Sequence, residues 1–187
     1  MNNKCVIVGN SPNINNLGDK INSHDVIVRT GNPVISTFEQ HVGSRTDILV
    51  SRDMKRQKIS EEFLRQFKFI YVYPESDIKP KPSAYFIYSK CEINIDNNIL
   101  DQVDIALNLK PNEKPTLGLM AVCIMSGIYN NINICGIETE YTSKYLHKGY
   151  YNNHAYMRAN DHHSIRKELL YLNKLIRRQV IHILNNK

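Results

Sequence analysis

The chain of 187 residues is about the size of one globular domain, and 42% of its residues are hydrophobic, which is ordinary for a protein that folds in water. It has no apolar run long enough to span a bilayer and does not begin like a secretory signal peptide, so we expect a soluble protein. The formal net charge of +6 favours an anionic ligand or an anionic membrane face as a partner. No motif of a nucleic-acid-binding module is present.

Short apolar runs alternate with longer segments whose apolar residues recur at helical spacing. The short runs predict strands at residues 5–8, 25–29, 47–51, 69–73, 132–136 and 180–184. The periodic segments predict helices at residues 60–67, 98–107, 114–128 and 164–178. This alternation is typical of a single α/β domain over residues 1–187, with a mostly parallel, Rossmann-like sheet of about six strands flanked by helices. Residues 85–88 are left open, either as an edge strand or as part of a binding site.

Polar turns follow the first two predicted strands. Gly9, Asn10 and Ser11 follow the first, and Gly31 and Asn32 follow the second. In open α/β sheets, nucleotides bind at the carboxyl ends of the strands, where glycine lets the backbone approach a ligand. The alternative is that both are ordinary turns between strand and loop.

A second glycine-containing turn precedes the most apolar predicted helix. Thr116, Leu117 and Gly118 lie at its start, where free N–H groups and the helix dipole attract a phosphate or carboxylate. Gly136 ends the buried strand that follows this helix. The alternative is a plain helix start with Pro115 in its first turn.

Histidines and tyrosines gather before the last predicted helix. His163 stands five residues before Glu168, and His147, Tyr150 and Tyr151 lie upstream. A histidine can take a proton near neutral pH, so His163 is a candidate general base. The alternatives are a histidine that caps the helix and tyrosines that only pack over the sheet. We do not expect a metal site. The candidate ligands all come from one loop and lack a recognised spacing. They are His147, His154, Asp161, His162 and His163.

These segments resemble the sialylmotifs of the eukaryotic-type sialyltransferases. The large motif is matched by residues 5–11, 21, 23–25, 28–29 and 42–46, and the small motif by residues 115–138. The third motif resembles residues 147–152, and the very small motif has the His163 to Glu168 pattern. The resemblance extends from Cys5 to about residue 183 and is weaker between residues 52 and 114.

The resemblance implies a sialyltransferase-like variant of the GT-A fold and a CMP-sugar donor. It implies His163 as the catalytic base, Glu168 as a residue that orients the site, and His147 beside the leaving phosphate. It implies donor contacts from Gly9, Asn10, Ser11, Asn32, Thr116, Leu117, Gly118, Gly136, Tyr150 and Tyr151.

The sequence departs from the family pattern at four places. Gly31 stands where the family usually has Asn, and Leu117 stands where it usually has a small or hydroxylated residue. Tyr150 and Tyr151 come one place later than in the family. In the family, the counterpart of Cys5 forms a disulfide with a cysteine that aligns with Tyr129 here. We therefore expect no such disulfide, and a cytoplasmic microbial or viral protein from a reducing compartment.

We predict an inverting, metal-independent glycosyltransferase that moves sialic acid from CMP-sialic acid to a glycan hydroxyl, with no cofactor. The acceptor would be a glycan on lipid or polysaccharide, and the basic carboxyl-terminal region would offer a peripheral contact with a membrane. Two alternatives stay open. The donor could be another CMP-ulosonic acid such as CMP-Kdo, or the chain could be a non-catalytic module that binds CMP or a glycan.

Overall fold

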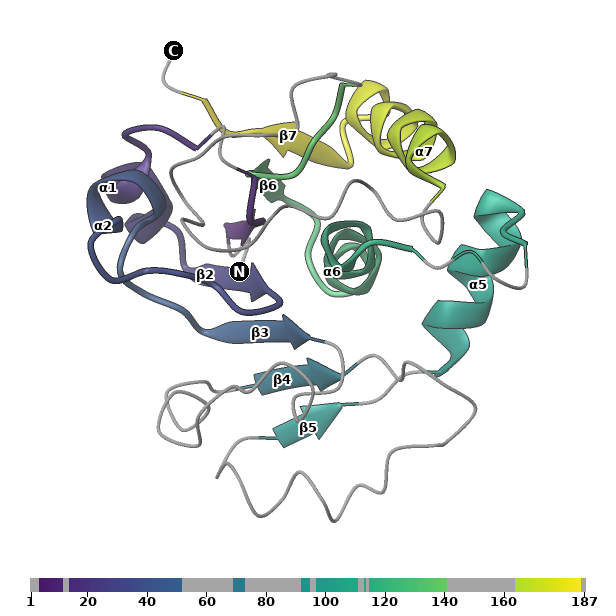
Figure 1. Ribbon diagram of the computed structural model, residues 1–187, viewed down its shortest axis with the longest axis horizontal. Coiled ribbons are helices and arrows are strands. Elements are labelled where there is room, and N and C mark those ends of the chain that lie inside the picture. The colour runs from purple at the N-terminus through teal and green to yellow at the C-terminus, as the bar shows by residue number, and fades with distance from the viewer. Residues whose placement is uncertain are drawn as a thin grey trace.

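A seven-stranded parallel sheet organises the part of the chain that the structure describes. The structure is a computed structural model and describes residues 4–11, 14–51, 69–72, 92–94, 97–110, 113, 115–140 and 164–185. The strand order is β5-β4-β3-β2-β1-β6-β7 (Figure 1). The strands are β1 Cys5–Val8, β2 Val26–Thr30, β3 Ile48–Ser51, β4 Phe69–Val72, β5 Glu92–Asn94, β6 Ile132–Cys135 and β7 Ile181–Ile183.

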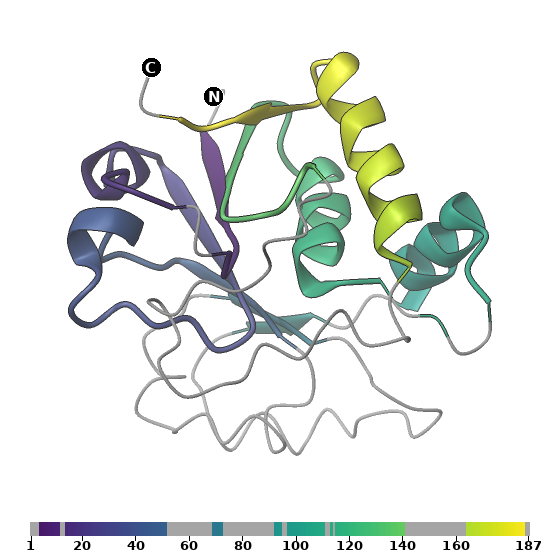
Figure 2. The same cartoon turned by 45° about the horizontal axis from the view of Figure 1, so that its top comes forward.

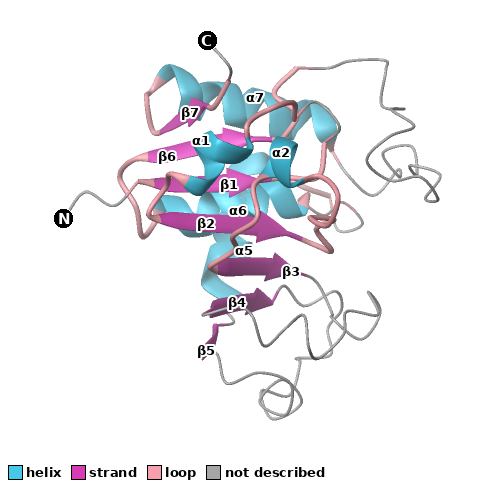
Figure 3. Ribbon diagram, turned by 90° about the vertical axis from the view of Figure 1, so that its left-hand side faces the viewer, coloured by secondary structure: helices cyan, strands magenta, loops and turns pink. Residues whose placement is uncertain are grey.

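Helices cover both faces of this sheet. The short helices α1 (Gly18–Asn22) and α2 (Glu39–Val42) lie together on one face. The longer helices α5 (Asn97–Leu107), α6 (Leu117–Ser126) and α7 (Ile165–Arg177) lie on the other, as Figures 1 and 2 show. Figure 3, which looks from the side of α1 and α2, shows the strands running in one direction beneath these two helices.

The two layers of helices explain why β1 reads as a continuous apolar run. Successive side chains of a strand point to opposite faces of the sheet. Cys5 and Ile7 join the core under α6, whereas Val6 and Val8 join the core under α1 and α2. All four residues are buried, so neither face of β1 offers a place for a polar side chain.

The chain changes direction across the sheet next to β1. From β1 it builds β2, β3, β4 and β5 outward on one side, and it then returns to place β6 on the other side of β1. The carboxyl ends of β1 and β6 are therefore neighbours, with Val8 opposite Cys135. In open α/β sheets, ligands bind in the crevice at such a reversal of strand order.

The structure confirms the mostly parallel α/β sheet and the six predicted strands, with ends that differ by at most one residue. It adds β5, which the sequence did not indicate because Glu-Ile-Asn contains no apolar run. It also adds α1 and α2, which are only five and four residues long. The predicted helix at 60–67 and the open segment 85–88 lie outside the described residues.

Within the described residues, no helix has the length and apolar character needed to cross a membrane.

Candidate active site

Two glycine turns meet at the crevice between β1 and β6. The N–H of Gly9 donates to the carbonyl oxygen of Cys135 at 2.8 Å, and the N–H of Ser11 donates to that of Gly136 at 2.9 Å. A Cβ at Gly9 would lie 2.2 Å from the Gly136 oxygen, a distance at which atoms overlap. Gly136 has a φ of +63°, which L side chains rarely adopt, and its own Cβ would lie 2.4 Å from Ile14 Cδ1. Both glycines are thus required for the turns to approach each other.

Asn10 connects the first turn to the end of β2. Its Nδ2 donates to the carbonyl oxygen of Thr30 at 2.9 Å. Gly31 follows with a φ of +65°, and its N–H donates to the Val50 oxygen at 2.8 Å. The side chain of Asn10 therefore fixes the spacing between the two polar turns that the sequence analysis singled out.

Gly31 and Leu117, at two of the positions that depart from the family pattern, are neighbours in the structure. A Cβ at Gly31 would lie 3.5 Å from Leu117 Cδ1, an ordinary van der Waals contact. The larger Leu117 side chain thus packs beside a residue that has no side chain. Neither residue lines the cavity described below, and Asn32 is exposed beside them.

Glu168 of α7 holds the start of α6. Thr116 is the N-cap of α6, and its hydroxyl accepts a hydrogen bond from the Leu119 N–H at 3.3 Å. The Thr116 N–H donates to Glu168 Oε1 at 3.1 Å, and the Thr116 hydroxyl donates to Oε2 at 2.6 Å. Glu168 is only 3% exposed. A carboxylate of the protein itself, rather than one of a ligand, therefore binds this helix start. Its bonds join α6 and α7 through two residues that are 52 positions apart in the sequence.

Ser11 and Glu138 close the crevice from the β6 side. The Ser11 hydroxyl donates a hydrogen bond to Glu138 Oε1. Glu138 is the second residue after Gly136, and the sequence analysis did not select it. A carboxylate so soon after a buried strand that ends in glycine was the signal that could have identified it.

These turns and helices enclose a cavity of about 250 Å³. Its volume is close to the lower end of the range for small-molecule sites, about 300 Å³. One wall is polar and comes from the turns, and the other is apolar and comes mainly from α7. The lining residues are Gly9, Asn10, Ser11, Thr30, Thr116, Gly118, Gly136, Ile137, Glu138, Ile165, Glu168, Leu169 and Leu172. An apolar wall facing convergent polar groups suits a ligand with a flat ring and hydroxyl groups.

The cavity brings together most of the predicted donor residues that the structure describes. Gly9, Asn10, Ser11, Thr116, Gly118 and Gly136 line it, and so does Glu168. His147, Tyr150, Tyr151 and His163 lie outside the described residues. Their predicted roles stay predictions.

Comparison with known proteins shows what the chain is similar to. Residues 2–80 match the profile of Glycosyltransferase family 29 (sialyltransferase). The type 2 lactosamine alpha-2,3-sialyltransferases of Rattus norvegicus and Homo sapiens are 25% and 26% identical to the chain over 95% of its length. The chain is therefore similar to sialyltransferases over most of its length. It spans 63% of the length of these curated relatives.

Solved sialyltransferase structures share the fold. A mammalian sialyltransferase in complex with Gal-beta-1-3GalNAc-ortho-nitrophenol superposes with a TM-score of 0.68 at 19% identity, covering 99% of this chain and 70% of that one. An alpha-2,3-sialyltransferase from Campylobacter jejuni in apo form gives 0.61 at 17% identity, covering 100% and 77%. The CstII sialyltransferase of the same organism, in complex with CMP-3FNeuAc, gives 0.55 at 15% identity, covering 98% and 86%. These likenesses confirm the predicted sialyltransferase-like α/β fold. The microbial or viral source stays a prediction.

Arg29, part of the large-motif resemblance, has a structural role in this chain. It is fully buried and turns toward the segment that follows α2. Its Nε donates to Thr46 Oγ1 at 2.8 Å, and its Nη2 donates to the carbonyl oxygens of Val42, Gly43 and Arg45 at 2.8–3.0 Å. The motif pieces at 28–29 and 42–46 therefore meet in space and stabilise the scaffold behind the crevice.

The cysteines that the structure describes are free thiols. Cys5, Cys123 and Cys135 form no disulfide, as predicted for Cys5. Burial, with a smaller contribution from Asp47, raises the pKa of Cys5 to about 12. Tyr129, at the position of the family's partner cysteine, packs against the core that contains Cys5. Among the described residues there is no cluster of three or more His, Cys, Asp or Glu side chains that could hold a metal ion.

Proposed function

We propose that this chain is an inverting, metal-independent sialyltransferase that uses CMP-sialic acid as donor and a glycan hydroxyl as acceptor. The observation that carries the proposal is the cavity at the strand-order reversal, which is lined by residues from both motif turns in a chain whose residues 2–80 match the sialyltransferase profile. This is the place at which an α/β sheet binds a nucleotide.

The donor's nucleotide lies against the two glycine turns in this proposal. Asn10 and Ser11 present polar groups, and Ile165, Leu169 and Leu172 present an apolar wall for a flat ring. Because Gly9 and Gly136 carry no side chains, their turns pack closely together and present backbone at the cavity wall.

His163 is the proposed general base. It deprotonates the acceptor hydroxyl as that oxygen attacks the anomeric carbon, while the bond from this carbon to the CMP phosphate oxygen breaks. One displacement inverts the configuration, and CMP leaves as an anion next to His147 and the tyrosines. The described residues support this placement indirectly, because Ser164 caps α7 and Glu168 of α7 bonds to Thr116 at the donor site. The chain at residue 164 is thus tied to the donor cavity.

The test is an acceptor-array assay that measures CMP release and sugar transfer from CMP-sialic acid. Transfer to a glycan is expected, and it should be unchanged when EDTA is added. Transfer from CMP-Kdo but not from CMP-sialic acid would assign the other donor. Loss of transfer in EDTA with recovery on adding a divalent metal would contradict the metal-free mechanism. Calorimetric binding of CMP without transfer or donor hydrolysis would instead indicate a non-catalytic module.

A further inference from the structure

Thr30 is the last residue of β2 and lines the cavity, although it is not among the residues selected from the sequence. Its side chain follows that of Val28 by two residues, so both side chains lie on the same face of the sheet. Val28 packs in the core under α6. Thr30 therefore points to the side of the sheet on which α6 and α7 close the cavity, and it is only 4% exposed.

The strands β1 and β6, which follow β2 across the sheet, are each followed by a glycine. Val8 of β1 pairs with Arg29 of β2, so the next residues along these two strands are Gly9 and Thr30. Gly136 comes after β6, on the other side of β1. Both glycines line the cavity and have no side chain. Thr30 is therefore the residue of this row of three that presents a side chain to the cavity.

Three of the described residues that line the cavity carry a hydroxyl group, and the protein uses two of these groups itself. The Ser11 hydroxyl donates to Glu138, and the Thr116 hydroxyl donates to Glu168. Among the described residues, no group forms a hydrogen bond with the hydroxyl of Thr30. A buried hydroxyl without a partner costs free energy, so such a group is expected where a ligand supplies the partner.

The backbone around Thr30 is fixed by the protein itself. Thr30 is paired with Val50 of β3, and its carbonyl oxygen accepts a hydrogen bond from Asn10 Nδ2 at 2.9 Å. The N–H of the next residue, Gly31, donates to the Val50 oxygen at 2.8 Å. A β-branched side chain has few rotamers to lose. The hydroxyl can therefore bind a ligand at a small cost in conformational entropy.

We propose that Thr30 is a nucleotide-binding residue whose hydroxyl forms a hydrogen bond with the CMP part of the donor. The inference rests on the proposed function, in which a CMP-activated sugar binds this cavity. A hydroxyl can both donate and accept, so it suits a ribose hydroxyl or a phosphate oxygen. Because the described part of the protein offers it no partner, the hydroxyl contributes to ligand binding and not to the stability of the fold.

The experiment measures CMP affinity by calorimetry and the free energy of unfolding by urea denaturation in the same variants. Thr30→Val removes the hydroxyl and keeps the shape of the side chain. It should lower CMP affinity by about three- to tenfold, the usual contribution of one hydrogen bond, and leave stability equal or higher. Thr30→Ser keeps the hydroxyl and loses a buried methyl group. It should bind CMP within about twofold of the wild type and be the less stable of the two variants.

Two further measurements locate the contact. In the transfer assay, Thr30→Val should raise KM for CMP-sialic acid and leave kcat little changed, because the bond is made in the ground state and the transition state alike. Calorimetry with cytidine identifies the ligand group. A loss of affinity for CMP alone assigns the phosphate, and an equal loss for cytidine assigns the nucleoside.

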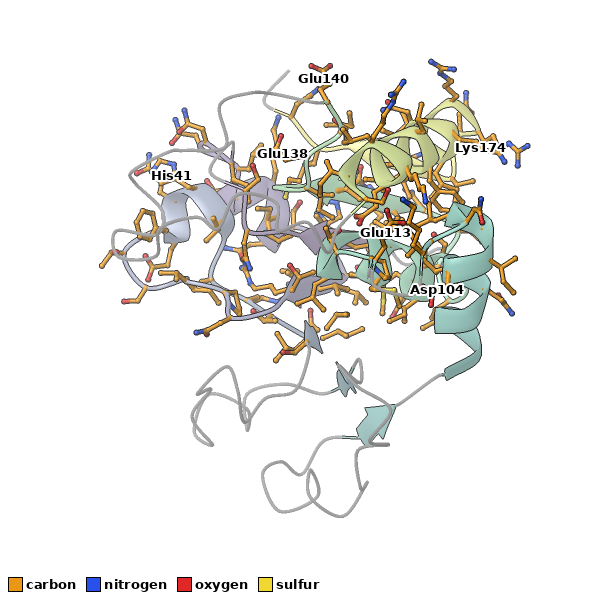
Figure 4. The ribbon with its side chains drawn as sticks, turned by 45° about the vertical axis from the view of Figure 1, so that its right-hand side comes forward. His41, Asp104, Glu113, Glu138, Glu140 and Lys174 are labelled. Atoms are coloured by element: carbon orange, nitrogen blue, oxygen red, sulfur yellow. The ribbon has the colours of Figure 1, made fainter. Side chains whose placement is uncertain are left out.

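Thr139→Val is the matched control, because it makes the same chemical change outside the cavity. Thr139 follows the lining residue Glu138 but does not itself line the cavity. Figure 4 shows Glu138 over the middle of the sheet and Glu140 further out, at the upper edge of the molecule. The chain therefore leaves the cavity at Thr139, and Thr139→Val should keep CMP affinity within about twofold.

Each outcome bears on the inference or on the function beneath it. Equal CMP affinity in the wild type and Thr30→Val would overturn the inference alone, and so would an equal loss in Thr30→Ser or Thr139→Val. A large loss of stability in Thr30→Val would also overturn it, because the hydroxyl would then support the fold. Weaker CMP binding by Thr30→Val in a chain that transfers no sugar would support the inference and contradict the proposed transferase. Failure of the wild type to bind CMP would overturn both.

Discussion

A single carboxylate, that of Glu168, accounts for the geometry at the junction of α6 and α7. It accepts two hydrogen bonds from Thr116 and is almost fully buried. The first helical residue of α7 follows Ser164 directly, so Glu168 lies in the first turn of α7. We therefore expect Glu168 to act as a positioning residue for the proposed base.

Replacing Glu168 should disturb both stability and turnover. Glu168→Ala leaves the Thr116 N–H and hydroxyl without their acceptor, and hydrogen bonds to charged groups are worth roughly 1.5–3 kcal/mol. We expect that loss in the free energy of unfolding, measured by urea denaturation. Turnover of the fraction that stays folded should also fall, and Glu168→Gln should restore part of it.

Glu113→Gln is the control for the Glu168 variants. Glu113 pairs at 2.9 Å with Lys167, the residue before Glu168 in α7. Hydrogen bonds from the Lys110 backbone and the Lys167 side chain lower the pKa of Glu113, but pairs near the surface contribute little. If Glu113→Gln and Glu168→Gln had the same effect on turnover, Glu168 would have no special role.

His163 should be essential for turnover and dispensable for nucleotide binding. Removing a positioned general base lowers turnover by roughly 10²–10⁴-fold. We expect this loss in His163→Ala, with CMP affinity from calorimetry little changed, because the base faces the acceptor oxygen.

His162→Ala is the neighbouring control and should have a small effect. An inactive His162→Ala beside an active His163→Ala would mean that the motif alignment is shifted by one residue. Activity in both variants would require a different base, with His147 and His154 as candidates, and the proposed mechanism would fall.

At the scale of elements, the paired turns after β1 and β6 are the least tolerant part of the crevice. Gly136→Ala would place a Cβ 2.4 Å from Ile14 Cδ1 and 2.7 Å from the Gly9 oxygen, at a φ of +63°. Left-handed backbone costs an ordinary residue about 1–2 kcal/mol, and overpacking costs about 1–3 kcal/mol more. We expect a loss of about 2–5 kcal/mol in the free energy of unfolding, measured by thermal and urea denaturation.

Gly127→Ala is the matched control. Gly127 has a φ of −78° at the end of α6, and the nearest atom to its Cβ would be the Ile124 oxygen at 3.4 Å. The same chemical change should therefore be nearly neutral there. Equal stability of the two variants would mean that the β1 and β6 turns can separate without cost.

The elements that the sequence could predict are those whose residues are uniform in character. The four residues of β1 are all apolar because both faces of the strand are buried, so the strand is evident without a structure. The edge strand β5 has polar residues at both ends and left no such pattern. The motif turns at Gly9 and Thr116 were predicted as ligand contacts, and both line the cavity. The contact of Gly31 with Leu117, and the bonds from Ser11 to Glu138 and from Thr116 to Glu168, depend on how distant turns meet, which no local pattern encodes.

At the scale of the whole molecule, part of the excess positive charge lies on exposed side chains of α7 and its carboxyl end. Arg166, Lys174, Arg177 and Arg178 are exposed, and Leu170 on the same helix is 67% exposed. Basic residues near an anionic membrane contribute about 1 kcal/mol each.

We therefore expect the chain to bind vesicles rich in phosphatidylserine at low salt and to be released as salt rises, because screening shortens the reach of the charges. Arg177→Glu combined with Arg178→Glu should lower vesicle affinity by about tenfold or more in a sedimentation assay. The control is Lys4→Glu combined with Lys20→Glu, which makes the same change in net charge at exposed residues on β1's amino-terminal side and on α1. If both double variants lost affinity equally, net charge rather than α7 would govern attachment. If the wild type ignored anionic vesicles at low salt, the peripheral membrane contact would be wrong, and the basic surface would serve only to attract the anionic donor or acceptor.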